Sequence, residues 1–273
     1  LHPPTRDVMN CLSRSVLQLY AFDEDAEDRS YAHEIDTAIM LLSRLPRIAV
    51  LAYCAMRDKF LGESLYIHHF VPGERTAETI LSMLRPDRSF TEEEARVLDI
   101  MLMLHAEHGG GNNSTFTCRT LTSSDTDPYS AYSGAIGSLK GARHGGANNR
   151  VLAMTDDIEE HVKDITDEGQ VADYLRRILR KEAYNRTGLI YGMGHAVYTL
   201  SDPRAEVLHE YAKDLVSGTE YEREFRLLEL IEQLTPDLMR EKGTTKQVCA
   251  NVDLYSGCVY SALGIPRDML TPI

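Results

Sequence analysis

Residues 91–104 have the sequence Thr-Glu-Glu-Glu-Ala-Arg-Val-Leu-Asp-Ile-Met-Leu-Met-Leu, which combines a helix start with a long apolar run. Thr91 and Glu94 have the spacing of a capping box, in which each side chain hydrogen-bonds the backbone N–H of the other residue. The residues that follow are apolar on almost every side of a helix: Val97, Leu98, Ile100, Met101, Leu102, Met103 and Leu104. The stretch therefore predicts a helix that runs through a hydrophobic core.

Helical periodicity continues beyond this stretch, in two sets of apolar residues with the spacing of a buried helical stripe. The first set is Val171, Tyr174, Leu175, Ile178 and Leu179, and the second, which is expected to end before Pro236, is Tyr221, Phe225, Leu228 and Ile231. Asp127-Pro128 and Asp202-Pro203 each combine an N-cap with a proline at the first helical position. Because sustained strand alternation is absent, the predicted fold class is all-α.

The composition limits the kinds of partner and compartment. A formal net charge of −13 argues against a nucleic-acid partner, because phosphate binding needs a positive surface. The five cysteines show no CxxC spacing, so we expect free thiols and a cytoplasmic protein. No apolar run approaches the roughly 20 residues of a membrane span, and no signal-peptide pattern opens the chain, so no membrane partner is expected. The start at Leu1 and the apolar final residues suggest a fragment.

Three histidines adjoin glycines, which allow a ligand to approach the backbone closely. They are His108, which precedes three glycines, His144, which precedes two, and His195, which follows one. Together they indicate one shared site, although a single such histidine is more often structural. His144 precedes a predicted helix, whose positive dipole end favours the neutral imidazole. A neutral ring can donate a hydrogen bond to an enolate oxygen, and the alternative role is a helix cap.

Three further positions could contribute to that site, and each has an ordinary structural alternative. Asp253 is flanked by apolar residues, so its carboxylate could be a desolvated base or simply a helix cap. Arg204 is expected in the first turn of a helix, where the dipole disfavours a cation, so either an anionic ligand or a surface position is expected. His105 and His108 share a helix face and could bind a metal, but no HExxH motif or carboxylate cluster supplies further ligands.

Four segments together resemble the citrate synthase family, in the family's order and from about His105 to the C-terminus. The matching segments are residues 104–108 with Asn112 and Ser114, residues 144–148, residues 192–197 through 202–204, and residues 251–253 through 264–266. Residues 1–89 fit the helical N-terminal half of the family only loosely. The resemblance implies a multi-helical fold and an acyltransferase that condenses acetyl-coenzyme A with oxaloacetate in the tricarboxylic acid cycle.

The resemblance also implies a role for each residue of the expected site. Asp253 is the implied base that removes a methyl proton, His144 hydrogen-bonds the thioester oxygen, and His195 polarises and protonates the ketone of oxaloacetate. The implied oxaloacetate-binding residues are His108, Arg204 and Asn112, and the implied coenzyme A-binding residues are Gly192, Gly194 and Lys246. No metal and no redox cofactor is implied, because coenzyme A enters as part of a substrate.

By the same resemblance, residues 1–147 and 254–273 form a large domain and residues 148–253 form a small one, with the site in the cleft between them. The family is homodimeric, and an arginine of the partner subunit completes each site. In the family the chain continues beyond Ile273 and supplies that arginine and a further substrate arginine. Neither has a counterpart here, so we expect this chain to bind oxaloacetate weakly and to turn over poorly.

Three alternatives remain open. A 2-methylcitrate synthase would differ by accepting propionyl-coenzyme A, and one methylene in an apolar pocket changes selectivity by only about 1–3 kcal/mol. A metal-dependent hydrolase would use His105, His108 and His144 as ligands. A catalytically silent homologue would fit the missing arginines, but it has no chemical reason to keep His144, His195 and Asp253.

Overall fold

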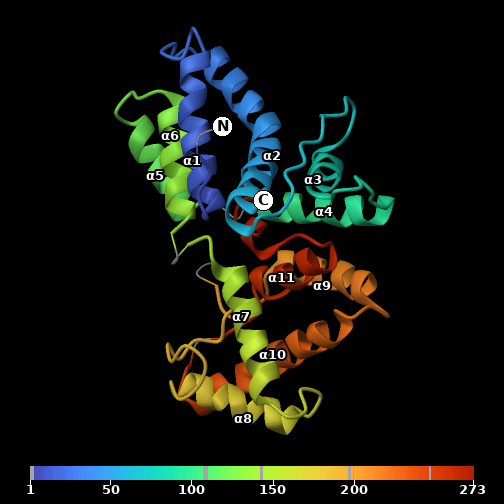
Figure 1. Ribbon diagram of the computed structural model, residues 1–273. Coiled ribbons are helices and arrows are strands. Elements are labelled where there is room, and N and C mark those ends of the chain that lie inside the picture. Colours follow the sequence, from blue (N-terminus) through green and yellow to red (C-terminus); the bar gives the residue numbers. More distant parts are fainter. Residues whose placement is uncertain (1–2, 107–109, 142–143, 196–197, 199, 246) are drawn as a thin grey trace. The chain divides into compact units, whose positions relative to one another are not determined.

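The computed structural model describes residues 3–106, 110–141, 144–195, 198, 200–245 and 247–273. Within these ranges every regular element is a helix, and the only β-type pairing is an isolated bridge between Met193 and Ala250 (Figure 1). The predicted all-α class is therefore confirmed. The five cysteines are free, as predicted.

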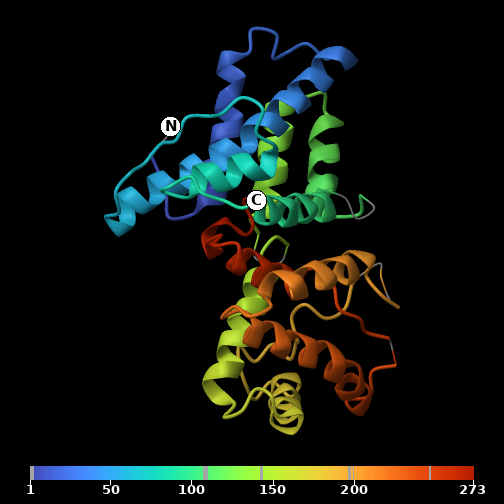
Figure 2. The same cartoon turned by 90° about the vertical axis from the view of Figure 1, so that its right-hand side faces the viewer.

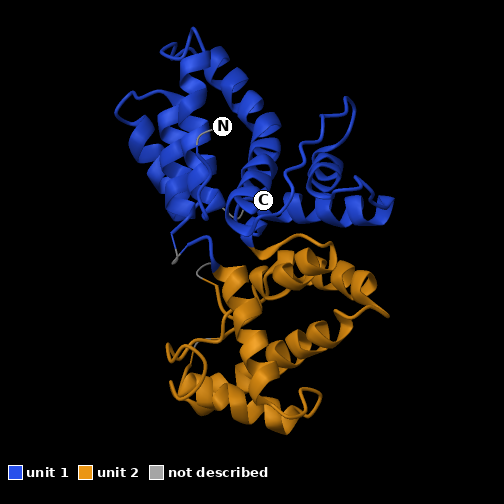
Figure 3. Cartoon of the chain, viewed as in Figure 1, with its two compact units in different colours: residues 1–146, 268–273 blue, residues 147–267 orange. Residues whose placement is uncertain are grey.

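The helices form two compact units, which Figure 3 shows in different colours. Unit 1 comprises residues 1–146 and 268–273, and unit 2 comprises residues 147–267. The helices of unit 1 are α1 (Val8–Leu19), η1 (Tyr20–Phe22), α2 (Tyr31–Leu61), α3 (Thr76–Leu84), α4 (Glu92–Ala106), α5 (Asn113–Thr122) and α6 (Pro128–Leu139). The helices of unit 2 are α7 (Ala147–His161), α8 (Glu168–Leu179), α9 (Pro203–Val216), α10 (Glu222–Glu241) and α11 (Asp253–Ala262). The short η2 (Arg267–Met269) lies where the chain returns to unit 1.

Unit 2 extends beyond the residues 148–253 expected for the small domain, because α11 belongs to it. This helix packs on α7, α9 and α10, and it lies beside α7 and α9 in both Figure 1 and Figure 2. Gly257 permits the close approach to α7, since a Cβ atom there would lie 2.8 Å from Cγ of Leu152. Because α11 packs within unit 2, the C-terminal boundary of this unit lies at residue 267.

The stretch 91–104 forms α4 and begins as predicted. The Thr91 N–H donates to the Glu94 carboxylate at 2.7 Å, and the Glu94 N–H donates to Thr91 Oγ1 at 3.2 Å. The expectation that the helix runs through the core holds only for its first part, because its buried residues end at Met101 and Met103 is 63% exposed. When apolar residues lie on all sides of a helix, the sequence does not tell which side another helix covers. Helix α4 packs on α3.

The two predicted helical stripes lie on α8 and α10 of unit 2. All five residues of the first stripe are buried in α8, as predicted. The second helix was expected to end before Pro236, but α10 continues to Glu241. A proline removes one backbone donor, and the buried Thr235 hydroxyl next to it donates to the Ile231 carbonyl at 2.5 Å. Burial of α10 against α8 and α11 outweighs the local preference to stop.

Helix α2 departs from the expectation that nothing in the chain is long and apolar enough to span a membrane. An 18-residue stretch of it has a mean hydropathy of 1.5, and 39% of that stretch is buried. Core helices of water-soluble proteins pass the same test, and α2 packs on α1, α3 and α6. Length and hydropathy alone therefore do not make α2 a membrane span.

Candidate active site

Two segments of unit 2 that are distant in sequence pair with each other and bring the predicted residues together. The Gly194 N–H donates to the Cys249 carbonyl at 2.7 Å, and the Asn251 N–H donates to the Gly192 carbonyl at 2.9 Å. These bonds flank the isolated bridge between Met193 and Ala250. Residues 192–194, called the glycine segment below, are thereby held against the residues that immediately precede Asp253.

Glycine is required at position 192 by both conformation and space. Gly192 has φ +81°, and a Cβ atom there would lie 2.8 Å from the Leu254 Cα atom. A side chain would therefore collide with the backbone of α11 and would also be strained. Gly194 also has a positive φ, +87°, but a Cβ atom there would make only an ordinary contact, 3.8 Å from Val248 Cγ1. The sequence-predicted glycines thus determine how closely the segment approaches the first turn of α11.

Asp253 is the first residue of α11 and is half-buried. Its N–H donates to Asn251 Oδ1 at 3.0 Å, and the other end of the Asn251 amide donates to the Gly194 carbonyl at 2.8 Å. Asn251 therefore links the glycine segment directly to the proposed base. The motif quoted in the sequence included Asn251, but no role was predicted for it.

His195 has a defined hydrogen-bonding state on one ring nitrogen. The Tyr198 N–H donates to His195 Nδ1 at 3.2 Å, and the two rings lie with their centroids 4.8 Å apart. A backbone N–H can only donate, so Nδ1 must accept and carries no proton. In the neutral ring the proton then lies on Nε2, so Nε2 is the donor nitrogen of this imidazole.

Arg204 is buried, which excludes the simple surface position. It is 9% exposed, and its Nε and Nη2 atoms donate to the two carboxylate oxygens of Asp202 at 3.0 and 2.7 Å. Its guanidinium carbon lies 5.5 Å from the centroid of the Tyr198 ring. Burial would lower the pKa of Arg204, but the Asp202 carboxylate outweighs this and raises it, so the cation is retained.

Asp202 caps α9, as the Asp-Pro pair predicted, and accepts the Arg204 N–H at 3.0 Å. Its second oxygen also accepts the Val252 N–H at 3.3 Å. Burial would raise the pKa of Asp202, but the hydrogen bonds from Arg204 and Val252 lower it below the ordinary value. The carboxylate is therefore ionised between the two segments, a contact that local sequence patterns do not reveal.

His144 and Asn112 lie in unit 1. The Ser114 N–H donates to His144 Nε2 at 3.3 Å, and the Ser114 hydroxyl lies 2.8 Å from the same nitrogen. Nε2 must therefore accept, so the neutral ring carries its proton on Nδ1. Helix α7 begins three residues later, at Ala147, as predicted. Ser114 belonged to the quoted motif, but its contact with a residue 30 positions away could not be predicted from spacing.

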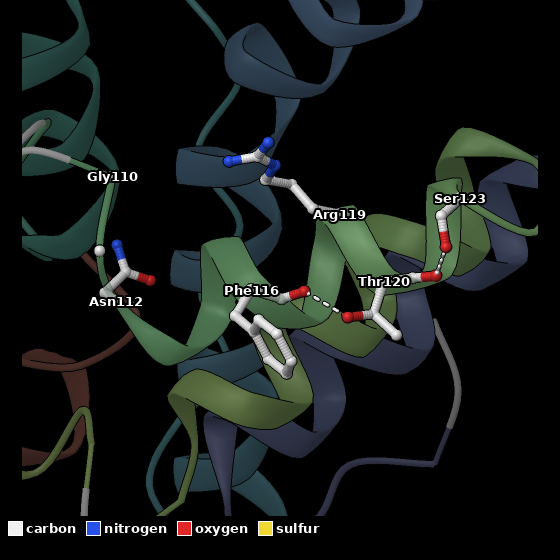
Figure 4. Close-up of a pocket in the computed structure, with 7 residues that line it drawn as sticks. Gly110, Asn112, Phe116, Arg119, Thr120 and Ser123 are labelled. Atoms are coloured by element: carbon white, nitrogen blue, oxygen red, sulfur yellow. Dashed lines mark hydrogen bonds between the residues drawn. The ribbon is translucent and has the colours of Figure 1, made fainter.

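Asn112 caps α5 by accepting the Thr115 N–H at 2.8 Å. It also lines an open pocket of about 430 Å³ together with Gly110, Gly111, Phe116, Arg119, Thr120 and Ser123. Figure 4 shows Phe116 and Arg119 projecting from α5 in different directions. The predicted residues His108 and Lys246 lie outside the described residues. His105 hydrogen-bonds the Met101 carbonyl through Nδ1 at 2.8 Å, so that nitrogen already has a partner.

Unit 2 thus brings together most of the predicted site residues that the structure describes: Gly192, Gly194, His195, Arg204 and Asp253. They are joined through hydrogen bonds of Asn251, Tyr198 and Asp202, and of these bonds only the helix cap by Asp202 was predicted. Unit 1 holds His144 with Ser114, and Asn112 at the start of α5. Unit 2 therefore offers a carboxylate, an imidazole and a buried cation, and unit 1 offers a second imidazole.

Comparisons with known proteins give one consistent family. The family model described as "Citrate synthase, C-terminal domain" matches residues 1–273. A citrate synthase of Deinococcus radiodurans is 42% identical over 183 residues, which cover 67% of this chain and 44% of that protein. A citrate synthase of Acidithiobacillus ferridurans is 32% identical over 277 residues, which cover 100% of this chain and 65% of that protein.

Another relative carries the alternative activity: a 2-methylcitrate synthase of Shewanella oneidensis is 31% identical over 247 residues, covering 90% of this chain and 59% of that protein. Among solved structures, citrate synthase from Pyrobaculum aerophilum has a TM-score of 0.78 and 27% identity, and the match covers 97% of this chain and 63% of that one. The chain thus spans 44–65% of the length of these relatives.

Proposed function

The chain belongs to the citrate synthase family, and we propose that it condenses acetyl-coenzyme A with oxaloacetate and water to give citrate and coenzyme A. The observation that carries the proposal is the hydrogen-bonded cluster of unit 2, which joins the glycine segment and Arg204 to the residues around Asp253. The buried Arg204 suits an anionic substrate. The Asp253 carboxylate, at the start of α11, suits proton abstraction.

In the proposed first step, the Asp253 carboxylate takes a proton from the methyl group of acetyl-coenzyme A. The thioester oxygen develops negative charge and accepts a hydrogen bond from His144 Nδ1–H. Ser114 supports this role, because its N–H occupies Nε2 and leaves the proton on Nδ1. A thioester α-proton is too weakly acidic for a free carboxylate, so the base and the hydrogen-bond donor must act together.

In the second step, the enol carbon forms a bond to the ketone carbon of oxaloacetate. The ketone oxygen takes the proton of His195 Nε2, the nitrogen left protonated by the Tyr198 N–H on Nδ1. Water then cleaves the thioester of citryl-coenzyme A, giving the citrate carboxylate, the free thiol of coenzyme A and one proton. The proton that Asp253 took balances the one that His195 gave, so both groups return to their starting states. No electron acceptor or metal enters this balance.

Binding roles follow the same proposal. Arg204, with His108 and Asn112, would hold the carboxylates of oxaloacetate, and the burial of Arg204 strengthens a charge-assisted bond. The coenzyme would lie along Gly192 and Gly194, with its phosphates near Lys246. Glycines have no side chain, and the positive φ of both residues sets the backbone path of this segment, which favours such close approach.

A homodimer is part of the proposal, and α5 is the surface that supports it. None of the residues of α5 is buried, and Phe116 is 69% exposed. An exposed aromatic on a helix with no buried side is typical of an interaction surface. We expect Phe116→Glu to shift the protein to monomers in sedimentation velocity, whereas Phe22→Glu, at a site 77% exposed, should not. Dimers that persist in Phe116→Glu would exclude α5 as the interface.

The activity is tested by mixing the protein with oxaloacetate and either acetyl- or propionyl-coenzyme A, and following loss of the thioester absorbance. Citrate should form only when oxaloacetate and acetyl-coenzyme A are both present. The 2-methylcitrate alternative, which the Shewanella relative favours, predicts faster turnover of the propionyl thioester. Thioester loss that does not depend on oxaloacetate would contradict both activities.

A further inference from the structure

Asp202 makes more hydrogen bonds than a helix cap requires. Its side chain is buried, with 1% of the residue exposed, and its two oxygens accept four N–H groups. One is the backbone N–H of Arg204, which is the capping bond. The other three come from the Arg204 guanidinium and from Val252, which belongs to a segment 50 residues later in the chain.

The bidentate contact defines how the guanidinium is oriented. Nε and Nη2 of Arg204 are bonded to Asp202, and the plane is also held against the Tyr198 ring. A planar guanidinium bound through two atoms has no remaining rotation. Its Nη1 atom makes no hydrogen bond to any residue that the structure describes, and this is the edge of the guanidinium that faces away from the Asp202 contact.

The fourth bond connects Asp202 to the proposed base. Val252 directly precedes Asp253, which starts α11, and the Val252 N–H is one of the donors that α11 itself cannot satisfy. One carboxylate therefore ties the start of α9 to the start of α11, two helices that pack on each other (Figure 1). The positions of Arg204 and Asp253 are coupled through it.

We propose that Asp202 is a positioning residue, whose carboxylate fixes the Arg204 guanidinium relative to Asp253 so that oxaloacetate is bound where the base can act. This role rests on the proposed function, because it assigns the Nη1 side of Arg204 to a substrate carboxylate. Asp202 itself touches no reacting atom in this assignment. Its effect on oxaloacetate binding runs through Arg204 alone, and its bond to the Val252 N–H holds the backbone before Asp253.

Charge and geometry predict opposite outcomes when Asp202 is replaced by asparagine. Asp202→Asn removes a negative charge beside Arg204, so electrostatics alone predicts tighter binding of the dianionic oxaloacetate. Loss of the charge-assisted bidentate contact frees the guanidinium, so the positioning role predicts weaker binding, by about 10-fold or more. The sign of the change in KM for oxaloacetate therefore distinguishes the two.

The experiment compares the unsubstituted protein, Asp202→Asn and the control Asp127→Asn. Asp127 is a matched control because it is also a buried N-cap before a proline, but it caps α6 in unit 1. Asp202→Asn should raise KM for oxaloacetate about 10-fold or more and KM for acetyl-coenzyme A much less. Asp127→Asn should change neither KM. An unchanged or lower oxaloacetate KM in Asp202→Asn would overturn the positioning role.

Two further measurements keep the outcome decisive. Removing one partner of a buried ion pair can unfold a protein, so Asp202→Asn/Arg204→Gln, which leaves no unpaired charge, is compared with Arg204→Gln. If Asp202 acts through Arg204, the two should have the same oxaloacetate KM, and an additional loss in the double variant would contradict the proposal.

The second measurement does not need turnover. The Nε–H signal of Arg204 in nuclear magnetic resonance spectra should exchange slowly with solvent in the unsubstituted protein and rapidly in Asp202→Asn. Rapid exchange in both would overturn the proposal. Lack of oxaloacetate-dependent turnover in the unsubstituted protein, with a slowly exchanging Nε–H, would instead contradict the proposed function and leave Asp202 as a structural clamp only.

Discussion

Helices α5 and α8 have similar lengths but different surroundings. The 12-residue α8 buries six side chains and packs on α10, whereas the 10-residue α5 packs on α6 and buries none. The apolar face of α8 is therefore buried within unit 2, whereas Phe116 on α5 of unit 1 is exposed. The comparison teaches that helical periodicity alone does not tell a core helix from a helix with no buried residue.

The same contrast applies to the site residues of the two units. In unit 2, Gly192, Arg204 and Asp253 are joined through backbone and side-chain bonds of neighbouring residues. In unit 1, the His144 ring contacts Ser114, the His144 N–H donates to the Gly141 carbonyl, and Asn112 caps α5, which has no buried residue. Within unit 2 the predicted residues are therefore bonded into one cluster, whereas within unit 1 the His144 ring is held by its contact with Ser114.

The largest expected difference is in stability, between truncations of the two helices. Leu175→Ala on α8 removes a side chain with 0% exposure and should lower the free energy of unfolding by about 2–5 kcal/mol. Phe116→Ala on α5, at 69% exposure, should change it by less than about 0.5 kcal/mol in the monomer. Urea unfolding of both variants measures this difference, and equal losses would show that α5 is as well packed as α8.

A smaller effect is expected from two glycines of unit 2 with positive φ. Gly192→Ala and Gly218→Ala share the conformational strain, but the new Cβ would meet the Leu254 backbone at 2.8 Å only at position 192. Gly192→Ala should therefore be less stable than Gly218→Ala by about 1–3 kcal/mol. Thermal unfolding by circular dichroism tests this. Equal midpoints would mean that the glycine segment is not held tightly against α11.

The smallest effect is a pH dependence of stability contributed by Asp202. The lowered pKa of its folded-state carboxyl means that its contribution is fully present above the unfolded pKa of about 3.9 and is lost as the pH falls through the folded value. The unsubstituted protein should therefore lose more stability than Asp202→Asn between pH 6 and pH 3. Urea midpoints measured across that range check the sign. Asp214→Asn, an exposed aspartate of α9, should parallel the unsubstituted protein.

The features that the sequence predicted correctly depend on nearby residues. The Thr91–Glu94 capping box and the Asp127 and Asp202 caps need only residues three or fewer positions apart. The stripe of α8 was likewise visible, because its period matches the helix and its neighbour covers one face. These elements could be predicted because their main contacts are local.

The features that were missed depend on distant neighbours. Helix α10 continues past Pro236 because tertiary packing outweighs one missing backbone bond, and the end of α4 is exposed because no described helix covers Met103. The contacts of Asp202 with Val252 and of Ser114 with His144 join residues 50 and 30 positions apart. Motifs identified the participants, but only the fold reveals which of them are bonded.

The central proposal, that the cluster around Asp253 carries out the condensation, is tested most directly by replacing that residue. Oxaloacetate-dependent release of the coenzyme A thiol should fall by about 10²–10⁴-fold in Asp253→Ala, because a general base contributes that much, and should be unchanged in Asp214→Ala. Both variants should retain the helical circular dichroism of the unsubstituted protein. Thiol release by folded Asp253→Ala at the unsubstituted rate would contradict the assignment of Asp253 as the base.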